Sequence, residues 1–431
     1  MYTHNYTVKL GKTRHKMTLS EELAWRGFVN QTTLSDPALL DSQIFTIYFG
    51  VDPSADSMTI GNLASIMMVR HFQKAGHKIF MLVGGATGVI GDPDGKAEER
   101  QLKSLEQIAH NKQCIAAEFT QVIGEDSFTL VDNYDWFKDM TVLDFLRNVG
   151  KHYSMTQLLD RDFIKSRIGE GGSGISFAEF SYSLIQGYDF LHLHREHGVN
   201  MQIAGADQWG NAISGVELVR KVTGEEVHIW TTPLIMNKST GKKFGKSEDG
   251  AIWLDPKQTS VYQFYQFWLN ADDAGVIDYI KVYTLLDKST IDELEAANTA
   301  NPQERTAQKA LAFEVTKIVH GEEAAASVRR ISEVLFGGAD YHSLQSDDFL
   351  QLTAQLPIHD IKIGDDLIEA LVSTELASSN TEARRFLNDG AVYLNGQQVS
   401  ADKVFSSSDV IASHAILRRG KNASAVLQVA D

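Results

Sequence analysis

Two short segments of the chain combine residue types suited to binding phosphate. The first is the turn at residues 52–63, which carries hydroxyl side chains, Gly61 and Asn62 directly after an apolar run. Free N–H groups at a helix start, beside hydroxyls and a glycine that allows close approach, form an anion site. The second is Lys243-Phe-Gly-Lys246-Ser247, which places two lysines around a Phe-Gly pair. Most such lysine pairs belong to solvated turns, so the second segment is informative only in combination with the first.

Short apolar runs that alternate with longer amphipathic stretches predict how these segments are positioned. The runs with the length of strands lie at residues 44–48, 79–83, 128–131, 199–203 and 227–235. Strands separated by helices predict βαβ units and a mostly parallel sheet. Because such sheets bind ligands at the carboxyl ends of their strands, we expect the chemistry in the turns after Tyr48, Val83 and Ile203.

The last third of the chain predicts further folded parts. Residues 261–335 have helical periodicity and no convincing strand, and residues 336–364 are predicted to be a linker. Beyond the linker, two helices precede Asn395-Gly396, a dipeptide that favours a tight hairpin between apolar residues. We therefore expect an α/β domain at residues 1–245, an α-helical domain at 246–335 and a small α+β domain at 365–431.

Composition excludes several classes of protein. The 431 residues include 40 Lys and Arg against 56 Asp and Glu, a formal charge of −16, so any nucleic-acid contact must come from local basic surface. Cys114 is the only cysteine in the sequence, which excludes a disulfide within the chain and a cysteine-based zinc site. No apolar run approaches the roughly 20 residues that span a bilayer. We expect a cytoplasmic protein that does not enter a membrane.

Familiar nucleotide and metal motifs are missing from the glycine-rich and histidine-rich segments. Residues 84–91 contain no G-x-G-x-x-G, and Gly95-Lys96 lacks the spacing of a Walker A loop. The histidines at 192, 194 and 197 do not share one helix face, so we expect no metal site held by the protein. Opposed charges at Asp92, Lys96 and Arg100 follow the glycine-rich turn and are expected to face the crevice.

Taken together and in order, these blocks resemble the class I aminoacyl-tRNA synthetases, whose paired signatures are HIGH and KMSKS. The likeness narrows to the bacterial-type tyrosyl-tRNA synthetases. The blocks that carry it are Tyr48-Phe-Gly-Val-Asp-Pro-Ser-Ala-Asp-Ser, residues 84–93, Asn133-Tyr-Asp-Trp136, residues 175–189, residues 202–211 and Lys243-Phe-Gly-Lys246-Ser247. The resemblance implies a Rossmann-like catalytic domain, an α-helical anticodon-binding domain and a small RNA-binding domain akin to a ribosomal protein.

By the same resemblance, the activity is to join tyrosine to ATP and to transfer the tyrosyl group to the 3′ end of tRNA(Tyr). Tyr48 and Asp189 are expected to hydrogen-bond the substrate phenol. The residues expected around the substrate ammonium group are Asp92, Tyr182, Gln186 and Gln208.

The nucleotide is expected at the neighbouring turns. The resemblance implies that Gly205 and Asp207 approach the ribose and that Gly61 allows close contact. The residues expected near the phosphates are Asp52, Ser54, Thr59, Asn62, Lys96, Arg100, Lys243 and Lys246. Mg²⁺ is expected to accompany ATP without a dedicated protein cage.

The first signature departs from the family pattern. HIGH is replaced by Thr59-Ile-Gly-Asn62, so both histidines are absent. Asn62 can still donate a hydrogen bond, whereas Thr59 is shorter and neutral. One donor removed from a transition-state site costs on the order of 3 kcal/mol. A slower adenylation step, or compensation by Ser54, the lysines and Mg²⁺, is the resulting hypothesis.

Partners and alternatives follow from the remaining segments. The segment at residues 136–159 resembles the family's dimer interface, which implies a homodimer. The module at 365–431 has six basic and nine acidic residues, a net charge of −3, so RNA binding and an accessory role are both open. The leading function is tyrosine–tRNA ligase. The alternatives are a catalytically weakened paralogue that binds RNA and a nucleotidyltransferase acting on another small substrate.

Overall fold

The computed structural model describes residues 17–92, 103–159, 162–169, 171–172, 174–241, 244, 246–247, 250–420 and 423–430. The chain divides into two compact units. Unit 1 comprises Met1–Leu254 and Ala274–Glu295, and unit 2 comprises Asp255–Asp273 and Ala296–Asp431. Among the described residues, none of the helices combines the length and the apolar character needed to cross a bilayer.

A parallel sheet forms the centre of unit 1. Within its described residues, the strands pair in the order β3-β2-β1-β4-β5. Their bounds are β1 Thr46–Val51, β2 Lys78–Val83, β3 Thr129–Asp132, β4 Met201–Gly205 and β5 His228–Thr232. The order reverses between β1 and β4, which is where parallel α/β sheets open a crevice for ligands. The sequence-based prediction of a mostly parallel sheet is confirmed.

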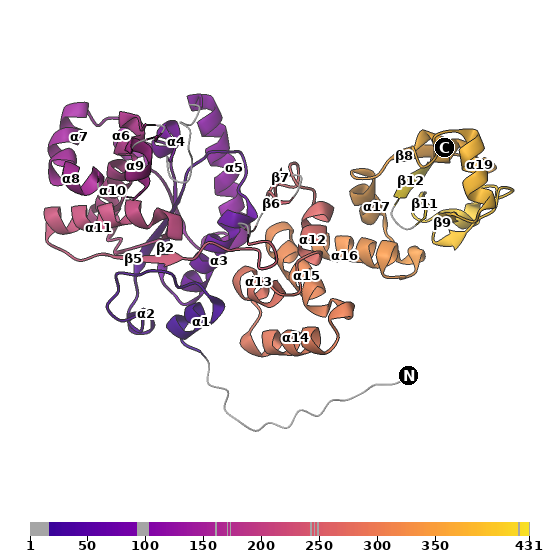
Figure 1. Ribbon diagram of the computed structural model, residues 1–431, viewed down its shortest axis with the longest axis horizontal. Helices are drawn as coiled ribbons and strands as arrows, with labels where there is room; N and C mark the ends of the chain where they lie inside the picture. Colours follow the sequence, from indigo (N-terminus) through magenta and orange to yellow (C-terminus); the bar gives the residue numbers. More distant parts are fainter. Residues whose placement is uncertain are drawn as a thin grey trace, which may run out of the picture. The chain divides into compact units, whose positions relative to one another are not determined.

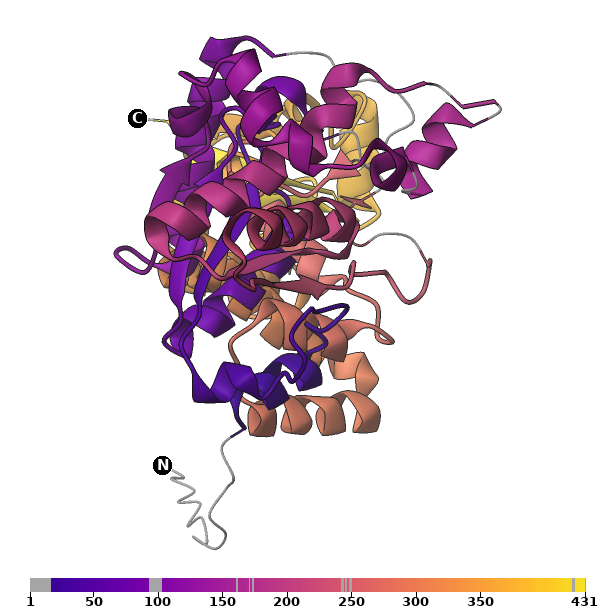
Figure 2. The same cartoon turned by 90° about the vertical axis from the view of Figure 1, so that its left-hand side faces the viewer.

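Helices cover both faces of this sheet (Figures 1 and 2). Helices α3 (Ile60–Lys74) and α5 (Leu105–Ile123) contact each other and β2, whereas α10 (Phe177–His197) and α11 (Trp209–Thr223) pack together, with α11 against β4 and β5. The strand cores are consequently buried, with Ile47, Tyr48 and Phe49 at most 5% exposed. This double cover explains why β1 reads as a continuous apolar run.

The other helices of unit 1 are shorter. They are α1 Leu19–Arg26, α2 Leu39–Ser42, α4 Thr87–Ile90, α6 Tyr134–Phe137, α7 Val142–Asn148, α8 Met155–Leu159, α9 Asp162–Ile168 and α13 Val276–Tyr283. The two-residue strands β6 (Lys246–Ser247) and β7 (Gly250–Ala251) pair antiparallel after β5.

Unit 2 contains a helical part and a small mixed sheet. The helices are α12 Val261–Leu269, α15 Thr306–His320, α16 Glu322–Phe336, α17 Ser346–Thr353, α18 Ile368–Ser373 and α19 Asn380–Asn388. Helix α14 (Lys288–Ala300) runs from unit 1 into unit 2. The sheet has the order β10-β9-β11-β12-β8, with bounds β8 Ile358–Ile361, β9 Val392–Leu394, β10 Gln397–Gln398, β11 His414–Arg419 and β12 Ala423–Val429.

The predicted hairpin at Asn395-Gly396 is present. It joins the antiparallel strands β9 and β10, and both turn residues have positive φ, 46° and 79°. Two successive positive φ values are what a two-residue hairpin turn requires, and asparagine and glycine adopt them most readily.

The segment at residues 336–364, expected to be a linker, differs from that expectation. It contains α17 and β8, and β8 pairs parallel to β12 from Ile358 opposite Val426 to Ile361 opposite Val429. Phe349 and Leu352 of α17 are buried in a cluster with Ile416. Tertiary pairing, which a local pattern does not reveal, therefore orders this stretch. The domain boundaries themselves stay a prediction.

Candidate active site

A cavity of about 660 Å³ lies at the carboxyl ends of the strands of unit 1. That size suits a small ligand. It brings together the predicted residues that the structure describes with their side chains: Tyr48, Asp52, Ser54, Thr59, Gly61, Asn62, Asp92, Tyr182, Gln186, Asp189, Gly205, Asp207 and Gln208. The predicted residues Lys96, Arg100 and Lys243 lie outside the described residues, and Lys246 is described only as the start of β6.

Helix α10 supplies three of the lining side chains from one face. Tyr182, Gln186 and Asp189 are spaced at i, i+4 and i+7, positions that follow each other along one side of a helix. The helix begins with a capping box between Ser176 and Glu179 and ends at Gly198 in the left-handed conformation. These two caps fix where the helix begins and ends, and so which of its residues face the cavity.

The hydroxyl of Tyr48 is a buried polar group of the cavity. The residue is 1% exposed, and its hydroxyl oxygen has no hydrogen-bond partner among the described residues. Burial raises the pKa of Tyr48 well above its ordinary value, and the nearby Asp189 carboxyl raises it further. A buried hydroxyl without a partner is costly unless a ligand supplies one.

Asp189 is fixed beside this hydroxyl by two donors. Asn133 donates from Nδ2 to Oδ2 at 3.1 Å, and Trp136 donates from Nε1 to Oδ1 at 2.9 Å. Burial raises the pKa of Asp189 to about 8, although both donors oppose that shift. Asn133 is itself held by the amide of Ala86 at 2.7 Å and donates to Thr87 at 3.1 Å. The glycine-rich turn after β2 therefore orients Asp189 through Asn133.

A second set of polar side chains in the cavity centres on Asp52 and Asp92. Tyr182 donates its hydroxyl proton to Asp52 Oδ2 at 2.7 Å, and Gln208 donates from Nε2 to Asp92 Oδ2 at 2.6 Å. Asn211 in turn donates to Gln208 Oε1 at 3.2 Å. Two carboxylates are thereby presented to the cavity with fixed orientation, an arrangement that attracts a cationic group.

The Thr59 turn opens helix α3 with side chains that cap it. Asn62 Oδ1 accepts from the Thr59 amide at 3.1 Å and from the Thr59 hydroxyl at 3.0 Å. Both bonds run from Thr59 to the Asn62 side chain as part of a capping box, and they engage the oxygen of the Asn62 amide. The nitrogen of that amide is the end which can donate to a ligand oxygen.

Backbone hydrogen bonds join this turn to the chain that follows β7. The Ile60 amide donates to Ile252 O at 3.1 Å, and the Leu254 amide donates to Met58 O at 2.9 Å. Thr59 and Trp253 form an isolated antiparallel bridge between them. The first phosphate-binding segment is therefore joined by main-chain contacts to residues 252–254, which follow the second segment in the sequence.

Close packing explains the glycine at the end of β4. A Cβ on Gly205 would lie 2.5 Å from Asp207 Oδ1. Any side chain at position 205 would therefore displace the Asp207 carboxylate, which lines the cavity.

The charge of the cavity is one-sided. Among its described lining residues, the carboxyl side chains are those of Asp52, Asp92, Asp189 and Asp207, and there is no lysine or arginine. A polyphosphate in this cavity requires cations from elsewhere, and the predicted Lys96, Arg100, Lys243 and Lys246 belong to the adjoining segments of the sequence.

Several lining residues were not predicted. Gln202 and Thr232 are 3% and 2% exposed, and the Gln202 Oε1 and Thr232 Oγ1 atoms have no partner among the described residues. Both lie in buried strands, and a polar residue within a buried strand is a signal that could have found them. Asn133 and Trp136 also escaped prediction as site residues, because they act through Asp189.

Comparison with known proteins assigns the family. Residues 41–337 match the family model described as tRNA synthetases class I (W and Y), and residues 348–426 match the model described as Tyrosine--tRNA ligase SYY-like C-terminal domain. A tyrosine–tRNA ligase of Neisseria meningitidis is 44% identical over 430 residues, covering 95% of this chain and 99% of that protein. One from Lactococcus lactis is 43% identical over 422 residues, covering 95% of this chain and 100% of that protein.

Solved structures agree with this result. The crystal structure of a C-terminally truncated Aspergillus nidulans mitochondrial tyrosyl-tRNA synthetase superposes with a TM-score of 0.67 at 28% identity. The match covers 74% of this chain and 95% of that one.

Proposed function

The chain belongs to the class I tRNA synthetases of tryptophan and tyrosine and is a tyrosine–tRNA ligase, and we propose that the cavity of unit 1 is where it activates tyrosine. In the first step the tyrosine carboxylate attacks the α-phosphorus of ATP. A carboxylate-oxygen-to-phosphorus bond forms, the bond to the bridging oxygen breaks, and pyrophosphate leaves with that electron pair. The nucleophile is already ionised, so no general base is required. Rate enhancement then depends on positioning and on stabilising charge at the phosphates.

The observation that carries this proposal is the pairing of Tyr48 with Asp189. The Tyr48 hydroxyl is buried and has no hydrogen-bond partner among the described residues, and Asp189 accepts hydrogen bonds from Asn133 and Trp136. A substrate phenol between them would supply the missing partner of Tyr48 and donate its own proton to Asp189. A phenylalanine side chain would leave both groups unpaired, which favours tyrosine.

The other predicted contacts extend from that point. The carboxylate of Asp92, predicted for this role, supports an ammonium subsite, and so does that of Asp52, which was predicted for the phosphates, since Gln208 and Tyr182 orient them. Asp207 and the close-packed Gly205 suit a ribose hydroxyl. The Thr59 turn and the four predicted cations Lys96, Arg100, Lys243 and Lys246 would meet the phosphates. Mg²⁺ would enter with ATP as part of the substrate.

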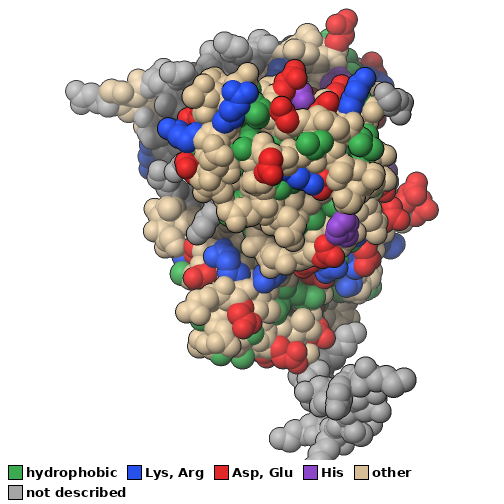
Figure 3. Space-filling view, turned by 90° about the vertical axis from the view of Figure 1, so that its right-hand side faces the viewer, with side chains coloured by type: hydrophobic (Ala, Val, Ile, Leu, Met, Phe, Trp, Pro, Cys, Tyr) green, Lys and Arg blue, Asp and Glu red, His purple; other side chains and the backbone are tan. Residues whose placement is uncertain are grey.

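In the second step, a ribose hydroxyl at the 3′ end of tRNA(Tyr) attacks the tyrosyl carbonyl carbon, and AMP leaves. Unit 2 carries basic and aromatic side chains suited to RNA: the Arg418 guanidinium lies 5.0 Å from the Tyr393 ring centroid, and that of Arg419 lies 5.1 Å from the Phe386 ring. Figure 3 shows a face on which acidic and basic side chains are interspersed. Contact with tRNA would therefore be local, with the helices of residues 246–335 at the anticodon.

A homodimer and a cytoplasmic location belong to the same proposal. Apolar side chains of α7 and α8 are exposed: Val142 at 74%, Leu143 at 78% and Met155 at 58%. Contiguous exposed apolar side chains mark interaction surfaces. Substituting Leu143→Glu should convert a dimer into a monomer in sedimentation velocity, and a monomeric wild type would refute this part.

The decisive test of the catalytic proposal is tyrosine-dependent exchange of labelled pyrophosphate into ATP. We expect exchange with tyrosine and little with phenylalanine, and loss of this preference in Tyr48→Phe. Ser65→Ala is the matched control, because it also removes one hydroxyl from the cavity lining, at a residue with no predicted role, and should keep the preference. Exchange that does not depend on tyrosine would overturn the assignment of the cavity.

A further inference from the structure

Phe244 belongs to the segment with the second phosphate-binding signature and forms part of the cavity wall. It is 7% exposed, and its amide donates to Ile235 O at 2.8 Å. In the sequence it lies between Lys243 and Lys246, the residues predicted to meet the phosphates of ATP. What holds the Phe244 ring therefore also fixes the point from which these neighbours extend.

An aromatic seat on α13 receives this ring. Phe244 stacks on Tyr279 with ring centroids 4.2 Å apart and an angle of 23° between the planes, and Tyr283 lies 6.1 Å away. Tyr279 and Tyr283 are 1% and 0% exposed, so the seat belongs to the core of unit 1. A Cβ on Gly275 would come within 2.5 Å of the Tyr279 ring, so the absence of a side chain there makes room for it.

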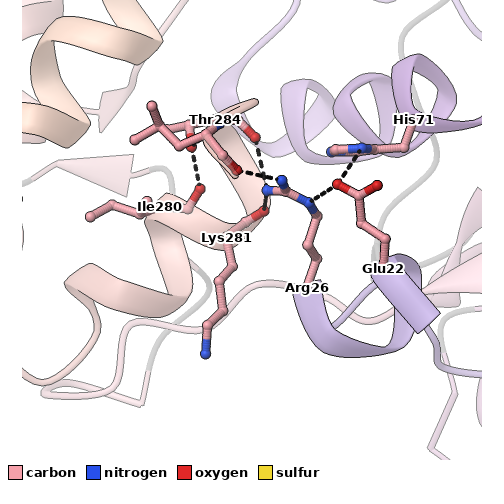
Figure 4. A network of polar contacts seen from close by, with 7 residues as sticks. Glu22, Arg26, His71, Ile280, Lys281 and Thr284 are labelled. Carbon is pink, nitrogen blue, oxygen red and sulfur yellow. Dashed lines mark hydrogen bonds and ion pairs between the residues drawn. The ribbon is translucent and has the colours of Figure 1, made fainter. Parts of the chain in front are cut away.

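Arg26 of α1 holds the other end of α13 (Figure 4). Its guanidinium donates from Nη1 to Lys281 O at 2.8 Å and to Thr284 O at 3.1 Å, and from Nη2 to Leu286 O at 2.7 Å. The last carbonyls of a helix lack partners within it and carry partial negative charge. A buried guanidinium, only 3% exposed, satisfies these carbonyls and fixes the helix end.

The Arg26 side chain is itself held by contacts that reach a third helix, α3. Arg26 Nε donates to Glu22 Oε1 at 2.9 Å, and the same carboxylate oxygen lies 3.4 Å from His71 Nδ1 of α3 (Figure 4). Helices α1, α3 and α13 are thus tied by one polar network around the buried Arg26. Helix α3 begins at the Thr59 turn, so the network links the supports of both signature segments.

We propose that Tyr279 and Arg26 are positioning residues for adenylate formation: Tyr279 seats Phe244, and Arg26 fixes the helix that carries Tyr279. This inference rests on the proposed function of the cavity. Neither residue touches the substrates. Their contribution is to limit where the segment between Lys243 and Lys246 can lie, and loss of such positioning by about 1 Å costs up to a hundredfold in rate.

The test compares four proteins in single-turnover adenylate formation and in tyrosine binding at equilibrium. Tyr279→Leu should lower the maximal rate by about tenfold and leave the dissociation constant of tyrosine unchanged. Tyr279→Phe keeps the ring and should restore most of the rate. Phe119→Leu, a buried ring of α5 packed on Phe128, serves as the control for lost stability and should keep the wild-type rate per folded molecule.

A double-mutant cycle with Phe244→Leu tests the seat from the opposite side, including the case in which Tyr279→Leu does not fold. If the two rings act as one unit, the double variant with Tyr279→Leu and Phe244→Leu should lose no more rate than either single variant. If Tyr279→Leu does not fold, Phe244→Leu alone must show the same loss of rate with unchanged tyrosine binding. Arg26→Lys should also lose rate, because one ammonium cannot reach three carbonyls, but less than Tyr279→Leu, because the seat itself remains. Wild-type rates in Tyr279→Leu and Phe244→Leu would refute this inference and leave the proposed function intact. A wild-type protein without tyrosine-dependent exchange would refute the proposed function.

Discussion

The two ends of the cavity are built in different ways. At the end with Tyr48 and Asp189, every described partner of Asp189 comes from a helix or a turn packed on the sheet, and the hydrogen bonds are 2.9 and 3.1 Å long. At the end with Thr59, the described contacts are a capping box and backbone pairing to residues 252–254. The cations predicted for that end follow the lining residue Asp92 or flank the lining residue Phe244 in the sequence. Under the proposed function, amino-acid recognition would rely on fixed side-chain partners, and phosphate recognition on helix-end geometry and added charge.

The largest effect is expected at the fixed end. Asp189→Asn would replace one of the two oxygens that accept from Asn133 and Trp136 by an NH2 group. That NH2 group would then face a donor and have no acceptor. An unsatisfied buried group costs about 1–3 kcal/mol, and we expect kcat/KM for tyrosine to fall by roughly 100-fold on that basis. Asp207→Asn is the matched change at the other end and should raise KM for ATP while tyrosine binding stays unchanged. If both variants changed kcat/KM for tyrosine and KM for ATP to the same extent, the two ends of the cavity would not differ in the substrate that they bind.

A smaller effect, of opposite sign, is expected at the Thr59 turn. Thr59→His would add a donor that reaches further toward the phosphates, at the loss of the bond from the Thr59 hydroxyl to Asn62. Since one transition-state donor contributes on the order of 3 kcal/mol and a helix cap about 1 kcal/mol, adenylate formation should accelerate by about 30-fold. Single-turnover kinetics measure this directly. An unchanged rate would show that the turn is not deficient in donors.

The bond between Tyr182 and Asp52 lies between the two ends. Removing it in Tyr182→Phe deletes one hydrogen bond of 2.7 Å and leaves the packing of the ring intact. We expect KM for tyrosine to rise by about fivefold, the equivalent of roughly 1 kcal/mol, with kcat little changed. A fall in kcat without a change in KM would mean that Asp52 serves the phosphates, as the sequence suggested.

The smallest predicted effect is on the pH dependence of the free energy of unfolding, and it concerns Asp189 alone. Its pKa is raised to about 8 in the folded protein, above the ordinary 3.8. The folded state therefore keeps this proton where the unfolded state releases it, so the resulting stabilisation is complete below about pH 4 and is lost as pH rises through 8. Urea midpoints at pH 5 and pH 9 should differ less in Asp189→Asn than in the wild type. An identical pH dependence would mean that Asp189 is ionised throughout.

Local sequence patterns captured the framework and the residues at strand ends. The parallel sheet followed from the alternation of apolar and amphipathic runs, whereas the residues of α10 that line the cavity were expected only from the family resemblance. The patterns missed Gln202 and Thr232, which are polar residues inside strands, and the supporting roles of Asn133 and Trp136. They also missed β8, since four residues, of which Ile358 is 44% exposed, carry little local signal. Contacts between distant parts of the chain decide all of these.

The pairing of β8 with β12 also bears on how this protein can be divided. A fragment that starts at residue 365 would strip the partner from Val426–Val429 and leave a row of bare amide and carbonyl groups beside apolar side chains. Such an exposed margin recruits other chains and promotes aggregation. Cutting instead ahead of α17 would keep the strand, its cover and the solubility of the isolated piece together.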